Sequence, residues 1–363
     1  MICAYNDNIG VRSQESGVRS QESGVREKRN SALELLRIAA MLMIVACHTN
    51  HANFNFPVDT ITINHLWQQF LGMGGPLGNN IFVLISGYFL IKSPGIKFRK
   101  LIDLALRMLF YSIIFYAIFI MCGSEKFSIK TLLENIRPGR YWFASAYLMM
   151  YLLHGWLNKF LTNLTRDDYK KFLMSIFLYW SIITMLTGLT LHGNHLTNFI
   201  CLYSLAGYVR IHADNFGAGK SAKFIWLGIG FIALNYLIII ITDLLGIRLL
   251  FIRRYIGYFT GMMRPFTILA GLCLLIGFKN LNISYSKIIN ILGAATFGVY
   301  LIHENIFVWQ FLWRRLFHNA TYQDSPYLIP YSILVILLVY VTCSIIEIIR
   351  SKIFKTLSRG YLS

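Results

Sequence analysis

The stretch Ala32-Leu-Glu-Leu-Leu-Arg-Ile-Ala-Ala-Met-Leu-Met-Ile-Val-Ala-Cys-His48 decides the fold class of this chain. It is apolar enough to form a membrane-spanning helix, yet it contains Arg37 and ends in His48. Such side chains are costly inside a membrane and usually functional. At about 100° and 1.5 Å per residue, Arg37 and His48 share one helix face roughly 16 Å apart. Glu34 lies one turn before Arg37, so the helix presents a carboxylate, a guanidinium and an imidazole in a line.

The composition of the whole chain is that of an integral membrane protein. Of its 363 residues, 56% are hydrophobic and 14% are charged, whereas a soluble domain has about 25% charged residues. We therefore predict an all-α integral membrane protein, a polytopic bundle of about ten transmembrane helices. The predicted spans are 32–50, 72–91, 101–122, 142–161, 172–191, 196–212, 224–243, 262–278, 288–312 and 327–349.

The formal charge of +18 comes mainly from the loops between these segments. Basic residues concentrate in alternate loops, and the positive-inside rule then places both termini in the cytoplasm. We expect a multi-pass protein of the plasma (inner) membrane, with the lipid bilayer as a partner. No exposed basic domain is visible, so nucleic acid is not expected as a partner. The third predicted loop, with Lys126 and Lys130, is more basic than an outer loop should be.

The chain divides into three regions by composition. Residues 1–30 are polar, and Val11–Gly17 is repeated without change as Val18–Gly24. Two seven-residue copies are too few for a solenoid, and the low apolar content predicts a disordered cytoplasmic tail. Residues 31–350 form the predicted transmembrane domain, and 351–363 a basic cytoplasmic tail.

Motifs in five of the apolar segments occur in a fixed order. They are Glu34-Leu-Leu-Arg37 with His48, Ile81-Phe-Val-Leu-Ile-Ser86-Gly87-Tyr88-Phe-Leu, Phe98-Arg99-Lys100 with Arg107, Tyr141-Trp142-Phe143 with Tyr147 and Tyr151, and Ala294-Ala-Thr-Phe-Gly-Val-Tyr300-Leu-Ile-His303. This order resembles the acyltransferase-3 family of integral-membrane acyltransferases. The resemblance implies transfer of an acyl group, usually acetyl from acetyl-CoA, to a hydroxyl of a surface or lipid-linked carbohydrate. It implies no tightly bound cofactor, because the acyl-CoA is a co-substrate.

His48, Arg37 and Glu34 are the candidate catalytic residues. An imidazole can remove the proton of an attacking hydroxyl, or it can carry the acyl group as a nucleophile. The alternative for His48 is a hydrogen-bonded histidine at a helix end. Arg37 suits a phosphate or a developing oxyanion. Glu34 either orients Arg37 or forms a purely structural ion pair with it.

The candidate donor-binding residues are Arg107, Arg99 and Lys100, at the cytoplasmic end of the third predicted span. Coenzyme A carries several phosphates, which Arg and Lys clusters bind well. The alternative for Arg99 and Lys100 is the ordinary positive charge of an inner loop.

The candidate acceptor-binding residues are Trp142, Tyr147 and His303. The two aromatic rings could stack on a sugar, although an interfacial aromatic belt explains Trp142 equally well. His303 lies in an apolar segment, where a titratable group needs a purpose. His192 and His195 have the spacing of a metal pair but no third ligand nearby, so no metal is expected.

The favoured hypothesis is a membrane O-acyltransferase with acyl-CoA and a carbohydrate as its partners. A polytopic transporter or flippase of a lipid-linked sugar has a comparable number of spans, but transporters often show internal repeats and none is visible here. A regulatory protein that has lost the chemistry is a further alternative, which the intact Arg37 and His48 disfavour.

Overall fold

The computed structural model describes residues 30–57, 59–188, 195–255 and 257–360. The predicted tail of residues 1–30, except its last residue, lies outside this part, as do His192 and the last three residues. The structure is 80% helical, and the described residues contain no strand, which confirms the all-α class.

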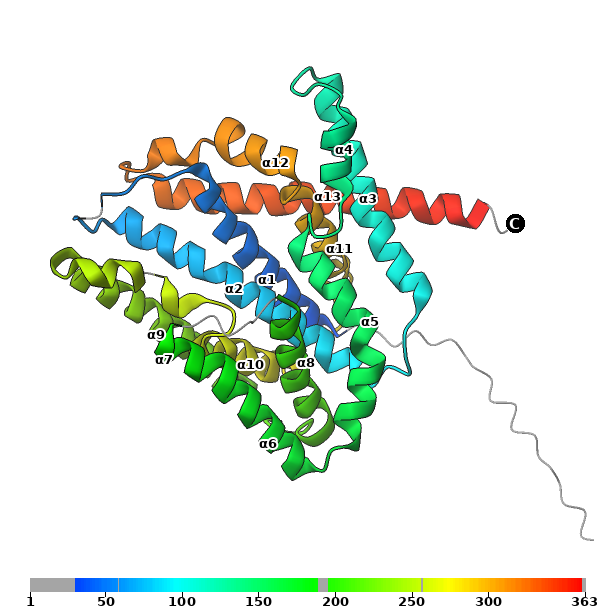
Figure 1. The fold of residues 1–363 in the computed structure, drawn as a ribbon. Helices are drawn as coiled ribbons and strands as arrows, with labels where there is room; N and C mark the ends of the chain where they lie inside the picture. Colours follow the sequence, from blue (N-terminus) through cyan, green and yellow to red (C-terminus); the bar gives the residue numbers. More distant parts are fainter. Residues whose placement is uncertain (1–29, 58, 189–194, 256, 361–363) are drawn as a thin grey trace, which may run out of the picture.

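Long helices follow one another along the whole described chain (Figure 1). Short 3-10 or π-helical turns, labelled η, extend or join them. The elements are α1 (Ser31–His48), η1 (Thr49–Ala52), α2 (Ile63–Leu90), α3 (Phe98–Met121), α4 (Ile129–Ile136), α5 (Trp142–Asn163), α6 (Arg166–Phe177), η2 (Leu178–Ile183), α7 (Thr184–Thr187), α8 (His195–His212), α9 (Ser221–Arg248), η3 (Leu250–Tyr255), η4 (Tyr258–Thr260), α10 (Pro265–Lys279), α11 (Lys287–His303), α12 (Ile306–Gln310), η5 (Phe311–Leu316), η6 (Asn319–Tyr322) and α13 (Leu328–Gly360).

Every predicted span falls largely on helix, but the number of membrane crossings is not confirmed. Among the described residues, five helical stretches are long and apolar enough to cross a membrane, and a bent pair built from α11 and the segment after it would make six. α2 and α5 are long enough to cross a membrane, but their polar side chains make them less apolar than the candidate spans. Those of Gln68, Asn80, His154 and Asn158 are buried inside the bundle rather than facing lipid. The structure thus supports a multi-pass membrane protein with five or six candidate spans.

α1 is the central helix of the bundle. It packs against α2, α10, α11 and α13, and Figure 1 shows α1 and α2 side by side in the middle of the molecule. Gly74, Gly75 and Gly78 of α2 face α1. A Cβ atom on Gly78 would lie 2.5 Å from the carbonyl oxygen of Ala40, so only glycine permits this approach. Close backbone packing through small residues is what holds helices together in lipid.

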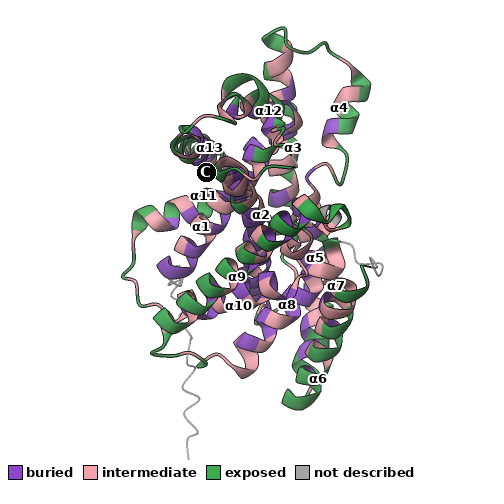
Figure 2. Ribbon diagram, turned by 90° about the vertical axis from the view of Figure 1, so that its left-hand side faces the viewer, coloured by how far each residue is buried: buried purple, intermediate pink, exposed green. Residues whose placement is uncertain are grey.

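The peripheral helices differ from α1 in burial. In the most apolar 18-residue stretch of α3, and in that of α9, 17% of the stretch is buried inside the protein. In the corresponding stretch of the α1 span, 56% is buried. Figure 2 shows the exposed residues on the outer helices and the buried ones in the middle. Apolar residues on α3 and α9 therefore face outward, toward lipid, while α1 directs its polar side chains into the protein.

Candidate active site

The first half of α1 holds an ion pair. The side chain of Asn30 caps the helix by accepting hydrogen bonds from the N–H groups of Ala32 and Leu33. Glu34 is buried, and its Oε1 lies 2.5 Å from Nη1 of Arg37. Gly293 of α11 packs directly against the Glu34 carboxylate, where any larger residue would clash. Glu34 is thus enclosed by the protein and fixes the position of Arg37.

Arg37 lines a cavity of about 240 Å³ between α1, α2, α3, α5 and α11. Lys100 and Tyr147 line the same cavity, so three of the predicted site residues from three helices meet here. The cavity follows α1 as far as Ile44, one turn short of His48. Its other polar side chains are Asn79, Ser86, Thr296 and Tyr300.

His48, at the end of α1, forms a second cluster with His303 and Glu304. The Nδ1 atom of His48 lies 3.0 Å from Nε2 of His303 and 3.0 Å from Oε1 of Glu304. The ring of His51 stacks on that of His48, with 5.2 Å between the ring centres. His303 is fully buried, whereas the side chains of His48 and Glu304 are 17% and 16% exposed.

The hydrogen bonds of this cluster decide which nitrogen of His48 carries the proton. Nδ1 of His303 lies 2.6 Å from the carbonyl oxygen of Val299, which can only accept, so Nδ1 of His303 is the protonated nitrogen. Nε2 of a neutral His303 is then an acceptor, as is the Glu304 carboxylate. Nδ1 of His48 therefore donates to Nε2 of His303, while Oε1 of Glu304 lies 3.0 Å from the same nitrogen without a hydrogen bond to it. It follows that Nε2 of a neutral His48 is unprotonated and can act as a base.

A break between two helices places His303 and Glu304 beside His48. α11 ends at His303, and the helical segment after Asn305 is bent from it by 74°. Asn305 caps α12 by accepting from the N–H of Phe307, and its amide donates to the hydroxyl of Tyr141 at 3.0 Å. Tyr141 in turn donates to the carbonyl oxygen of Leu301. These bonds hold the turn that directs the Glu304 carboxylate toward α1.

The same three residues have the spacing of a metal site. One potential ligand atom each from His48, His303 and Glu304 lie within 4.8 Å of one another. The donor–acceptor assignment above instead joins the two histidines by a hydrogen bond between Nδ1 of His48 and Nε2 of His303. The sequence-based expectation of no metal stays a prediction, and a chelator tests it.

Tyr300 lies between the cavity and the His48 cluster. It lines the cavity, and its ring centre is 6.4 Å from that of His303. Its ring centre is 5.7 Å from that of Phe143 in the first turn of α5, a helix with no side-chain cap. The Tyr300 side chain is 4% exposed, and its hydroxyl makes no hydrogen bond with the described residues. This buried donor points to a ligand that accepts a hydrogen bond.

The other predicted site residues lie elsewhere. Arg107 pairs with Asp103 at 2.8 Å and approaches the buried carboxylate of Glu347 at 3.5 Å, so it belongs to a network between α3 and α13. Arg99 is exposed and is not part of the cavity. Trp142 packs on His195, with 4.3 Å between the ring centres.

The fold, the cavity beside Arg37 and the cluster around His48 can now be compared with known protein families. The family model of the acyltransferase-3 group, described as an acyltransferase domain, matches residues 30–347. This chain is a member of the acyltransferase-3 family. The chain matches no curated protein and no solved structure. Membership and the apolar helices together identify a membrane acyltransferase, which favours the enzyme over the transporter hypothesis.

Two residues of the candidate site, Glu304 and Tyr300, were not among the site residues proposed from the sequence. Glu304 is next to His303, and its charge in an apolar segment was the available signal. Tyr300 lies inside the motif that ends in His303. The contact of His303 and Glu304 with His48 could not be predicted from the sequence, because His303 is 255 positions away from His48.

Proposed function

We propose that this protein is a membrane-bound O-acyltransferase that moves acetyl from acetyl-CoA to a carbohydrate hydroxyl, with His48 as the general base. The observation that supports this most is the hydrogen bonding of His48. Its Nδ1 donates to Nε2 of His303 and lies 3.0 Å from Oε1 of Glu304, which leaves Nε2 of His48 to take a proton. A carboxylate beside a histidine both orients the ring and stabilises its protonated form. We place both termini in the cytoplasm, so that the Arg37 end of α1 faces the donor.

The cavity beside Arg37 suits the narrow arm of coenzyme A. At about 240 Å³ it is smaller than the 300–1,000 Å³ typical of pockets that enclose a drug-sized ligand. It has room for an extended chain but not for the nucleotide of coenzyme A, which would stay at the entrance. Arg37 and Lys100 provide the positive charge there, while the cavity directs the thioester toward Tyr300 and His48.

The reaction follows from these positions. Nε2 of His48 takes the proton of the acceptor hydroxyl as its oxygen attacks the thioester carbon. The carbonyl oxygen becomes an oxyanion, which we expect the hydroxyl of Tyr300 and the first turn of α5 to stabilise. The intermediate then collapses with cleavage of the carbon–sulfur bond. His48 returns its proton to the thiolate, and the products are the acetyl ester and free coenzyme A.

The acceptor would reach His48 from the opposite end of α1. The side chain of His51 is 43% exposed; its ring stacks on that of His48 and contacts that of Trp309, with 5.1 Å between the ring centres. The guanidinium of Arg314 lies 5.0 Å from the centre of the Trp309 ring. An indole and a cation at this opening are suited to bind a sugar ring and its hydroxyls.

The decisive experiment is acetyl transfer by the His48→Ala variant in membranes supplied with acetyl-CoA and acceptor. We expect a loss of about 10²- to 10⁴-fold, the usual contribution of a general base. The matched control is His51→Ala, the next histidine on the same helical end, for which we expect a change of less than about tenfold because it lacks the Nδ1 bond to His303. Full activity in His48→Ala at a normal protein level would refute the proposal.

A further inference from the structure

Glu347 of α13 is a buried carboxylate that the proposed reaction does not use. It is 2% exposed. Its Oε2 accepts hydrogen bonds from the hydroxyl of Tyr111 at 2.6 Å and from Nε of Arg350 at 2.7 Å. Its Oε1 accepts from Nη2 of Arg350 at 2.6 Å, and Nη1 of Arg107 lies 3.5 Å from the same oxygen. Burying an ion pair often adds little net stability, and charge inside a membrane protein usually has a function, so this network needs an explanation.

Glu347 packs directly against α11, the helix that ends at His303. A Cβ atom on Gly298 would lie 2.5 Å from Oε2 of Glu347, so the carboxylate occupies the space in which a side chain of α11 would otherwise lie. Gly298 precedes His303 by five residues, which is roughly 7.5 Å along the helix. The carboxylate therefore fixes how α13 packs against the last two turns of α11.

Tyr111 joins the same carboxylate to the turn after α11. Its hydroxyl donates to Glu347, and its carbonyl oxygen accepts from Nδ2 of Asn305 at 3.5 Å. Asn305 is 1% exposed and directly follows Glu304. Tyr111 and Gly298 thus connect Glu347 to the chain on both sides of the helix break.

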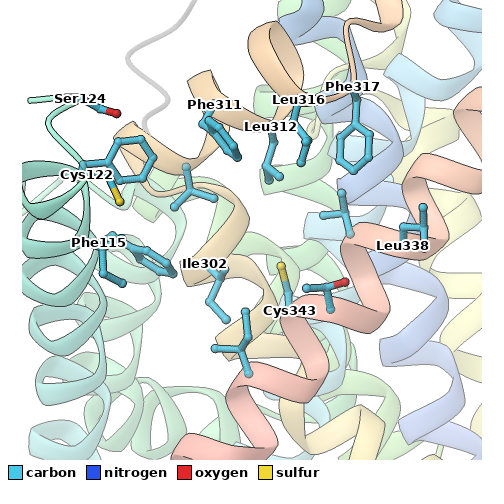
Figure 3. Close-up of a pocket in the computed structure, with 16 residues that line it drawn as sticks. Phe115, Cys122, Ser124, Ile302, Phe311, Leu312, Leu316, Phe317, Leu338 and Cys343 are labelled. Carbon is cyan, nitrogen blue, oxygen red and sulfur yellow. The ribbon is translucent and has the colours of Figure 1, made fainter.

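An apolar slot borders the end of α11 on the side of α3 and α13. It has a volume of about 370 Å³ and lies between α3, η5 and α13 (Figure 3). Ile302, the residue before His303, lines this slot, as does Cys343 of α13, one turn before Glu347. A side chain that lines a cavity lacks packing contacts on one side. We therefore expect the hydrogen bonds of Glu347 and Tyr111, more than apolar packing, to fix this end of α11.

Glu347 is arranged like Glu34 of α1. In both cases the carboxylate packs against a glycine of α11 and binds an arginine three positions later, which is Arg350 or Arg37. Arg37 lines the cavity described above, whereas Glu347 and Arg350 line neither that cavity nor the slot. The second pair is therefore placed to hold α11 rather than to bind a ligand.

We propose that Glu347 is a positioning residue of the acyltransferase site. It holds the end of α11 and, through Tyr111, the turn after it, and so keeps Glu304 beside His48. Arg107 balances part of its charge, which gives a role to a cation that does not line the cavity beside α1. This inference rests on the acyltransferase function proposed above, because Glu347 acts on the reaction only through His48.

The first test is the pH dependence of kcat in Glu347→Gln, which keeps the size of the side chain and removes its charge. We expect kcat to fall about three- to tenfold and its decline at acidic pH to begin at a lower pH, because a displaced Glu304 no longer favours the protonated imidazole of His48. A purely structural role would reduce the amount of active protein and leave the shape of the pH profile unchanged. Asp103→Asn removes the exposed carboxylate that also binds Arg107, and this control should behave as the wild type.

Hydrogen exchange measures directly how firmly the turn is held. In Glu347→Gln we expect the peptide covering residues 299–307 to exchange at least about fivefold faster, the effect of losing about one hydrogen bond, while peptides from α9 stay unchanged. Tyr111→Phe removes only the hydroxyl bound to Glu347 and should change the exchange and the pH profile in the same direction. Tyr116→Phe is its control, because Tyr116 is equally buried on the same helix but its hydroxyl donates to the carbonyl oxygen of Ser128.

The outcomes separate this inference from the proposed function. If Glu347→Gln and Tyr111→Phe both leave the pH profile and the exchange unchanged while His48→Ala is inactive, the positioning role is overturned alone. If Glu347→Gln does not fold, Tyr111→Phe decides by the same two measurements. Full activity in His48→Ala would instead overturn the proposed function itself.

Discussion

The polar residues at the two ends of α1 differ in how far away in the sequence their contacting residues lie. At the first end, Arg37 binds Glu34, three positions earlier on the same helix. At the other end, His48 meets His303 and Glu304, which come from a distant helix break. The first end is therefore a local arrangement that any helix with this sequence would favour. The second exists only because α11 ends beside α1.

This difference implies two kinds of function. The Arg37 end lines a narrow cavity and is suited to binding, while the His48 end has an oriented imidazole and is suited to chemistry. Changes at the His48 end should lower kcat, and changes at the Arg37 end should raise the KM for the donor.

The largest of the further effects is expected at Tyr300, where the two ends meet. Tyr300→Phe removes a hydroxyl aimed at the proposed oxyanion, and we expect kcat to fall about 10²- to 10³-fold with little change in the KM for acetyl-CoA. Steady-state kinetics on the purified protein measures this. Tyr236→Phe, which removes a hydroxyl bound to the carbonyl oxygen of Leu66, is the control and should leave kcat unchanged. An equal effect of both variants would argue for a general loss of packing instead.

Glu304→Gln should have the next largest effect. It removes the carboxylate charge that lies 3.0 Å from Nδ1 of His48 and favours the protonated imidazole, a loss of about 1–1.5 kcal/mol, and we expect kcat to fall about tenfold. Treatment of the wild type with a chelator distinguishes this role from metal binding. We expect no loss of activity and no bound metal by elemental analysis, and activity that returns only when a metal is added back would contradict the assignment.

Arg37→Ala tests the binding end of α1. We expect the KM for acetyl-CoA to rise about tenfold while kcat stays within a few-fold, because the guanidinium contributes binding rather than proton transfer. Arg99→Ala removes an exposed cation outside the cavity and serves as the control. The binding assignment fails if Arg37→Ala lowers kcat as strongly as Tyr300→Phe does.

The smallest expected effect is on the stability of the folded protein at acidic pH. It comes from a hydrogen-bond network around Asp214 that joins the ends of α2, α8 and α10. Tyr88 donates to Asp214 at 2.6 Å, and Arg210 donates to the same carboxylate at 2.7 Å. Burial raises the pKa of Asp214, but these hydrogen bonds and nearby cations outweigh it and hold the pKa below its ordinary value of 3.8. A lowered pKa stabilises the folded state above pH 3.8, and this stability is lost as the pH falls through the folded pKa.

Thermal unfolding in detergent between pH 3 and pH 7 measures this contribution. The wild type should lose more stability than Asp214→Asn over the acidic part of the range, because the variant has no proton to take up. Parallel curves for the two proteins would show that the network does not depend on the charge of Asp214.

The site was only partly predictable from the motifs. Lys100 and Tyr147 do meet Arg37 in one cavity, and His303 does meet His48. Arg107 instead pairs with Asp103 and Glu347, since the spacing to Asp103 allows an ion pair within α3. Trp142 packs on His195 of α8, a contact that no local pattern could indicate.

The sequence by itself determined the helical class, the membrane character and the family, because these follow from apolar segment length and from motifs read in order. It also determined the local pair of Glu34 and Arg37, whose spacing suffices to bring them together. Only the tertiary structure decided that His303 and Glu304 lie beside His48, that the hydroxyl of Tyr300 makes no hydrogen bond with the described residues, and that an apolar slot lies between α3, η5 and α13. The physical reason is that local patterns fix which residues share a helix face, whereas the contacts between distant helices depend on how the whole bundle packs.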